Sequence, residues 1–191
     1  MWKRSLFISA AAIALAVVAC TDTPTDPVTL DADLEPQFAR RGPLVHSATG
    51  AGHIAHPSGV VLDDTRIFAF TALEHADGTV TGQAQLNIIG VGFGSENPAI
   101  TNYFQAEVVC LTVEGDDAWI GAVIKTSSIP ANIGNEVGWR VRDNGQGNSA
   151  EPDGISTTQF PTNDPGFAQA FCDAKPNRFL NVVEQGNIQV R

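Results

Sequence analysis

The chain is poor in basic residues. It carries 11 Lys and Arg residues against 21 Asp and Glu residues, for a formal net charge of −10 at pH 7. Nucleic-acid binding depends on basic side chains that contact phosphates, so this balance argues against nucleic acid as a partner. An acidic balance is also common among exported domains and identifies no particular ligand.

The usual motifs of hydrolases and nucleotide-binding proteins are absent from the sequence. There is no Gly-x-Ser-x-Gly turn for a nucleophilic serine. The glycine-rich run at residues 90–94 is followed by Ser-Glu-Asn-Pro rather than an amphipathic helix, which predicts a loop and not a phosphate site. Glu74 or Glu107 could be half of a glycosidase carboxylate pair, but no spacing singles out a partner. We therefore expect a protein that is not an enzyme.

Long hydrophobic runs are also missing, except for one near the N-terminus. Residues 6–18 are apolar, follow Lys3 and Arg4, and lead into Ala19 and Cys20. A basic flank, a short apolar run and a small residue before the expected cleavage site predict an export signal at residues 1–19. The run is too short to cross a bilayer as a mature helix.

The end of this segment, Val17-Val18-Ala19-Cys20, resembles the lipobox of bacterial lipoproteins. The resemblance implies a diacylglyceryl group on the Cys20 thiol, cleavage before Cys20, and acylation of the new amino terminus, with palmitate among the acyl chains. Two or three acyl chains are enough for stable membrane anchoring. Thr21 stands where many lipoproteins retained at the inner membrane carry Asp, so the resemblance favours the outer membrane or cell surface. The alternative is an ordinary secretory signal with a chance cysteine.

Residues 20–45 have the composition of a disordered tether. They are rich in Thr, Pro and Asp, and Pro24, Pro27 and Pro36 interrupt any helix. Arg40 and Arg41 could touch lipid headgroups, although two charges make a weak anchor and a solvated linker end is the simpler interpretation. The remaining chain, residues 46–191, has a length typical of a single domain.

The three cysteines fit an exported protein. With Cys20 lipidated, Cys110 and Cys172 remain as an even pair, and an oxidising compartment makes a disulfide the simple inference. Cys172 follows a segment in which Asp164 can cap a short helix and Pro165 suits its first turn. The bridge would pin this helix to the sheet and stabilise the fold by about 4 kcal/mol. A nucleophilic cysteine, the alternative, would need a free thiol and a nearby base.

Period-2 alternation of apolar and polar residues predicts an all-β domain. The clearest stretch is residues 79–88, where every second residue is apolar or small: Val80, Gly82, Ala84, Leu86 and Ile88. Asp77 and Gly78, just before it, have the residue types of a tight hairpin turn. Related patterns predict eight strands, at residues 48–56, 66–75, 79–88, 101–113, 118–125, 137–143, 155–160 and 186–190.

Apolar residues that share one face of a strand define the predicted core. They are Phe68, Phe70, Ala72, Ala118, Ile120, Ala122, Val137, Trp139 and Val141. The fourth strand is apolar on both faces, which predicts a bulge or a covered face. Eight strands joined by local turns favour an antiparallel meander that closes into a β-barrel, with the last strand paired to the first. A two-sheet sandwich is the alternative, and Phe68 and Phe70 favour a filled interior.

An oxygen-rich loop at residues 143–154 is the main metal candidate. It concentrates hard ligands of the kind calcium prefers: Asp143, Asn144, Asn148, Glu151 and Asp153. The spacing does not match a calcium-loop pattern, and Asp, Asn and Gly are also what any long turn uses. Turn chemistry is the favoured interpretation, no cofactor is expected, and calcium is the alternative.

The histidines give a weaker metal candidate. His53 and His56 would point to opposite faces of a strand, which is poor geometry for one zinc ion unless a turn intervenes and His46 joins them.

Several motifs occur in an order that resembles a group of secreted bacterial domains of unknown function. They are residues 48–53, 66–72, 78–83, 109–113 with 118–121, and 143–147 with Asp153. The resemblance implies an exported β domain and carries no activity.

Three functional hypotheses follow. The first is a non-enzymatic envelope lipoprotein whose β domain contacts a protein or an envelope polymer through exposed positions such as Trp119 and Val123. The second is a hollow barrel that binds a small apolar ligand in a cavity of a few hundred Å³. The third is a metal-dependent hydrolase, which requires His53, His56 or the 143–154 loop to converge on one ion.

Overall fold

The computed structural model describes residues 42–55, 65–89, 101–146, 150–158 and 164–191. All of these residues lie in Pro36–Arg191, the second of two compact units of the chain. The expected signal at residues 1–19, Cys20, the tether up to residue 41, the loop at residues 90–100, His56 and Asn148 lie outside the described residues. Within the described part, no helix is long and apolar enough to span a membrane.

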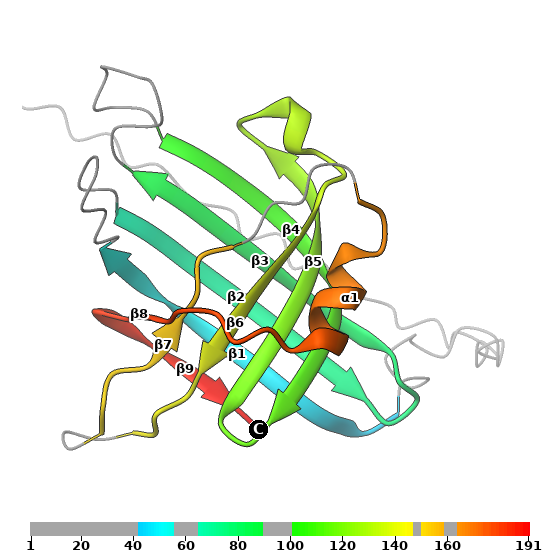
Figure 1. Ribbon diagram of the computed structural model, residues 1–191, viewed down its shortest axis with the longest axis vertical. Coiled ribbons are helices and arrows are strands. Elements are labelled where there is room, and N and C mark those ends of the chain that lie inside the picture. Colours follow the sequence, from blue (N-terminus) through cyan, green and yellow to red (C-terminus); the bar gives the residue numbers. More distant parts are fainter. Residues whose placement is uncertain (1–41, 56–64, 90–100, 147–149, 159–163) are drawn as a thin grey trace, which may run out of the picture. The chain divides into compact units, whose positions relative to one another are not determined.

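The described residues form one curled, nine-stranded antiparallel sheet that resembles half of a barrel (Figure 1). The strand order is β8-β7-β6-β5-β4-β3-β2-β1-β9, so consecutive strands from β1 to β8 are neighbours and β9 returns to pair with β1. The strands are β1 (Leu44–Ala55), β2 (Thr65–His75), β3 (Val80–Ile89), β4 (Thr101–Glu114), β5 (Asp117–Ser127), β6 (Glu136–Arg142), β7 (Gly154–Ile155), β8 (Asn181–Val182) and β9 (Gln185–Val190).

The all-β prediction is confirmed, whereas two finer predictions are wrong. The described residues form nine strands rather than eight, because β8 was missed, and their sheet is open rather than a closed barrel. The pairing of the last strand with the first does occur, with Ala51 opposite Asn187 and Thr49 opposite Gln189. At the other end, however, β7 and β8 have two residues each. The backbone ladder therefore does not continue from β6 to β9.

The core lies on the concave face of the sheet. All nine predicted core residues are buried there: Phe68, Phe70, Ala72, Ala118, Ile120, Ala122, Val137, Trp139 and Val141. The Phe70 ring meets Trp139 edge-on, with ring centroids 6.0 Å apart. The Asp77-Gly78 hairpin is also confirmed, because Gly78 has a φ of 79° and donates its N–H to the carbonyl of His75.

One helix, α1 (Phe167–Ala174), covers the opposite face of β4, β5 and β6 (Figure 1). A register shift between Val108 and Cys110 turns Cys110 toward this helix while Val108 stays in the core. Both the predicted bulge and the predicted covered face of the fourth strand are therefore present.

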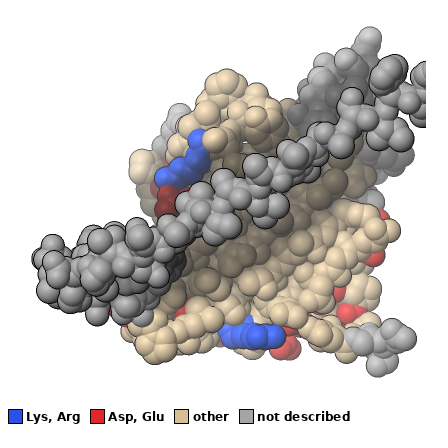
Figure 2. Space-filling view, turned by 180° about the vertical axis from the view of Figure 1, so that it is seen from behind, with Lys and Arg blue, Asp and Glu red and all other residues tan. Residues whose placement is uncertain are grey.

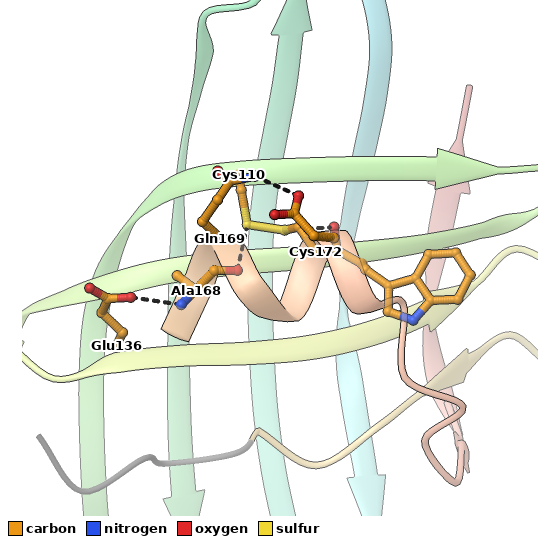
Figure 3. Close-up of a disulfide and its surroundings, with 7 residues drawn as sticks. Cys110, Glu136, Ala168, Gln169 and Cys172 are labelled. Carbon is orange, nitrogen blue, oxygen red and sulfur yellow. Dashed lines mark hydrogen bonds between the residues drawn. A yellow bond between two sulfur atoms is a disulfide. The ribbon is translucent and has the colours of Figure 1, made fainter. Parts of the chain in front are cut away.

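The disulfide between Cys110 and Cys172 fixes α1 to β4 (Figure 3). The helix begins without the expected Asp164 cap. Instead, the Glu136 carboxylate on β6 accepts the N–H groups of Gly166 at 2.9 Å and Ala168 at 2.6 Å. A carboxylate from the sheet thus accepts hydrogen bonds from N–H groups at the start of the helix, which have no partner within the helix itself.

Candidate functional site

The convex face of β9, β1, β2, β3 and β4 carries a two-row array of small and uncharged polar side chains. Strand alternation directs these residues away from the core. In the first row Gln189, Thr49, Thr71 and Gln83 lie opposite one another across four strands. In the second row Asn187, Ala51, Ala69, Gln85 and Gln105 do so across five. We call these nine residues the outer polar face.

The outer polar face is hollowed, and its nine residues are uncharged. On β4 the first row continues to Glu107, which lies opposite Gln83 and lines the same groove as Lys125. All nine residues line one open groove. Ala51 and Ala69, which lie opposite each other near its middle, are exposed and present only methyl groups. At its margin Lys125 pairs with Glu107 at 2.8 Å. Figure 2 shows this side of the molecule, where most of the described surface is uncharged.

Three of the five side-chain amides on this face are available to a ligand, whereas Gln105 accepts from Thr126 and Gln189 accepts from Arg191. Gln83, Gln85 and Asn187 are exposed, and none of the hydrogen bonds among the described residues uses their side chains. Each side-chain amide offers donors and acceptors together. The face can therefore make many hydrogen bonds to a partner without neutralising any charge.

The calcium candidates Asp143 and Asp153 bind backbone groups. Asp153 is buried, and its two oxygens accept the N–H groups of Asn144 at 2.9 Å and Ile188 at 2.7 Å. Asp143 accepts those of Gly145 at 2.8 Å and Val190 at 3.1 Å. These carboxylates therefore bind backbone N–H groups of β9 to which a neighbouring strand would bond in a closed barrel.

Of the other calcium candidates that the structure describes, Asn144 also makes a turn bond and Glu151 does not. The Asn144 side chain donates to the carbonyl of Pro152 at 2.6 Å, and Glu151 is exposed. Among the described residues, no group of three His, Cys, Asp or Glu side chains is placed to hold a metal ion.

The structure separates the histidines that were weighed as zinc ligands. His46 Nδ1 lies 2.8 Å from Glu74, and His53 Nε2 lies 3.6 Å from Glu184. His46 and His53 are seven residues apart on β1, which corresponds to roughly 23 Å along a strand. Glu74 and Glu107, each considered as half of a carboxylate pair, lie beside basic side chains instead, His46 and Lys125 respectively.

Trp119 is not an exposed contact residue, contrary to expectation. It is 6% exposed, and its indole N–H donates to the carbonyl of Pro176, in the segment that follows α1. The Arg140 guanidinium lies 5.5 Å from the Trp119 ring. The other suggested contact residue, Val123, is half-buried.

Sequence reasoning did not identify the ion cluster beside Trp119. Asp117 pairs with Arg140 at 2.8 Å and with Arg142 at 2.6 Å. Arg140 also donates to Asn177 and to the carbonyl of Arg178, which holds the segment after α1 across β5 and β6. Hydrogen bonding to Asp117 raises the pKa of Arg142 above its usual value. Nothing in the local spacing marks these residues as partners, since they come from three separate segments.

A small void lies in the concave interior. The void beside Phe68, Phe104 and Trp139 measures about 30 Å³. That is room for about one or two water molecules. This void is far smaller than the few hundred Å³ that an apolar ligand would need.

Comparison with family models, with curated proteins and with solved structures finds no match to this chain.

Proposed function

We propose that this protein is a non-enzymatic cell-envelope lipoprotein, anchored through Cys20, whose β domain contacts another envelope component through the outer polar face. The observation that carries the proposal is a broad, hollowed, uncharged array of hydrogen-bonding groups on a chain with a net charge of −10. A face that served only for solubility would be expected to carry charges, as the surfaces of soluble domains generally do.

Two features support a binding role over a catalytic one. The outer polar face consists of amides, hydroxyls and methyl groups, none of which titrates near neutral pH. The nearest charged groups, Glu107 and Lys125, are paired with each other. The face therefore has chemistry suited to recognition.

The anchor is tested by the intact mass of the protein purified from membranes of its host. We expect a chain that starts at Cys20 and carries acyl groups, and a Cys20→Ser chain that lacks them. An unmodified thiol at Cys20 would contradict the anchoring part of the proposal.

The binding role is tested with the detergent-insoluble fraction of the host envelope, which is free of lipid and so cannot capture the anchor. We expect the protein to sediment with this fraction and the Gln83→Ala/Gln85→Ala variant to stay in solution. Gln169→Ala is the control, because Gln169 is an exposed amide on α1 that is not part of the outer polar face and donates to Asp173. Equal sedimentation of all three proteins would contradict the proposed face.

A further inference from the structure

The chemistry of the outer polar face indicates what kind of component it binds. We infer, resting on the proposed function, that its partner is a neutral polysaccharide of the envelope, laid across the strands in the hollow beside Ala51 and Ala69. Sugar hydroxyls donate and accept hydrogen bonds, as do the side-chain amides of Gln83, Gln85 and Asn187. Neither the nine residues of the face nor a neutral sugar carries a charge that must be desolvated.

The spacing of the face suits a repeating polymer. Neighbouring strands lie about 4.8 Å apart. The first row therefore presents one polar side chain on each of four strands: Gln189, Thr49, Thr71 and Gln83. The interval between these side chains is comparable to the length of one sugar ring in an extended glycan. Between Asn187 and Gln85, the second row contains only the methyl groups of Ala51 and Ala69. This leaves room for the thickness of a sugar ring.

An aromatic ring stands beside these rows. Tyr103 is 45% exposed and lies opposite Asn87 on the neighbouring strand, one row beyond Gln85 and Gln105. The apolar C–H face of a sugar can stack on such a ring, while its hydroxyls bond to the amides.

The same features argue against the other classes of envelope partner. Protein interfaces depend on buried Trp, Tyr and Arg anchors, and the nine residues of the outer polar face include none of these. Anionic polymers need free cations, whereas Lys125, at the margin, is paired with Glu107 at 2.8 Å. The net charge of −10 would also repel an anionic chain.

The test uses the full protein in detergent and the detergent-insoluble envelope fraction. One portion of this fraction is treated with protease and another with periodate, which cleaves vicinal diols in sugars. Released polysaccharides are then separated on an anion exchanger into an unretained neutral pool and a retained anionic pool, and both pools are used as competitors. The variant Ala69→Arg fills the hollow at an exposed position, and Gln169→Ala is again the control.

We expect binding that survives protease, is abolished by periodate, is competed by the neutral pool and is insensitive to salt. Ala69→Arg should weaken it about tenfold or more, through lost hydrogen bonds and steric exclusion, and Gln169→Ala should leave it unchanged. Binding that is lost with protease, or competed only by the anionic pool, would overturn the glycan inference and leave the proposed function intact. Failure of the protein to bind untreated envelope would overturn both.

Discussion

Asp153 is a buried carboxylate whose two oxygens accept N–H groups from segments far apart in the chain. Its loop has the composition of a calcium site, and the favoured interpretation, turn chemistry, accounts for the bonds to Asn144 and Gly145. The sequence could not show that Asp143 and Asp153 also reach Val190 and Ile188, because such long-range contacts depend on where β9 pairs. The composition of the loop thus predicts the hydrogen bonds within the loop, whereas only the fold shows the hydrogen bonds from the loop to β9.

Replacing Asp153 should loosen β9. Asp153→Asn keeps one acceptor oxygen but directs an NH₂ group at the other backbone N–H, which leaves a buried donor unsatisfied. We expect the free energy of unfolding, measured in urea, to fall by about 1–3 kcal/mol. The amide hydrogen of Ile188 should also exchange faster. Glu151→Gln, at an exposed position of the same loop, is the control and should behave as the unmodified protein does.

Asp77 should give a pH-dependent contribution at the β2–β3 hairpin. The backbone N–H of Thr79 donates to its carboxylate at 2.9 Å and lowers the pKa of Asp77 below its ordinary 3.8. A lowered pKa in the folded state stabilises the fold above the unfolded pKa, and this stabilisation is lost as the pH falls through the folded value. The Tm of Asp77→Ala should therefore lie below that of the unmodified protein at neutral pH. The difference should shrink in acid, and one that is unchanged across this range would contradict the role of the charge.

Some features of helix α1 and its packing were predictable from the sequence, and others were not. The even cysteine count predicted its bridge to the sheet, and apolar residues on both faces of the fourth strand predicted the covered surface and the bulge. The prediction that Asp164 caps the helix is wrong. Glu136 on β6, 30 residues from Gly166 in the sequence, accepts the N–H groups of the first turn instead. Trp119 was expected to be exposed because nothing in its strand indicates that the segment after α1 covers it.

The docking of α1 also depends on two glycines of the sheet. Gly121 and Gly138 lie opposite each other on β5 and β6, beneath the helix. A Cβ at Gly138 would overlap the ring of Phe171. Gly138→Ala should therefore push the helix outward and lower the free energy of unfolding by about 1–3 kcal/mol. It should also make the disulfide more accessible to a thiol reductant. Ala170→Ser, on the exposed side of the helix, should change neither quantity.

The edges of the sheet explain why the barrel prediction failed. β8 has two residues, Asn181 and Val182, which is too short for any alternation to be recognised. Residues 155–160 carry a strand pattern, yet β7 ends at Ile155. Strand number and closure depend on these short pairings, whereas the core depends on long alternating strands. The core was therefore predictable and the closure was not.

At the scale of the whole molecule, uncharged polar residues from five strands gather on one face of the sheet. The alternating Thr81, Gln83, Gln85 and Asn87 were visible in the sequence as the wet face of a strand. What the sequence could not show was the register that aligns Gln83 with Thr71 and Gln85 with Ala69 and Gln105. Only that register turns separate polar residues into a continuous uncharged surface on an acidic protein.

Side-chain footprinting by hydroxyl radicals tests the central claim most directly, because it reports which surface the envelope covers. Tyr103 and Ile67, 45% and 41% exposed, flank the outer polar face, whereas Phe179, 79% exposed, lies in the segment after α1. With the detergent-insoluble envelope fraction present, we predict that oxidation of Tyr103 and Ile67 falls several-fold while that of Phe179 stays the same. Protection of Phe179 alone, or of none of the three, would contradict the account.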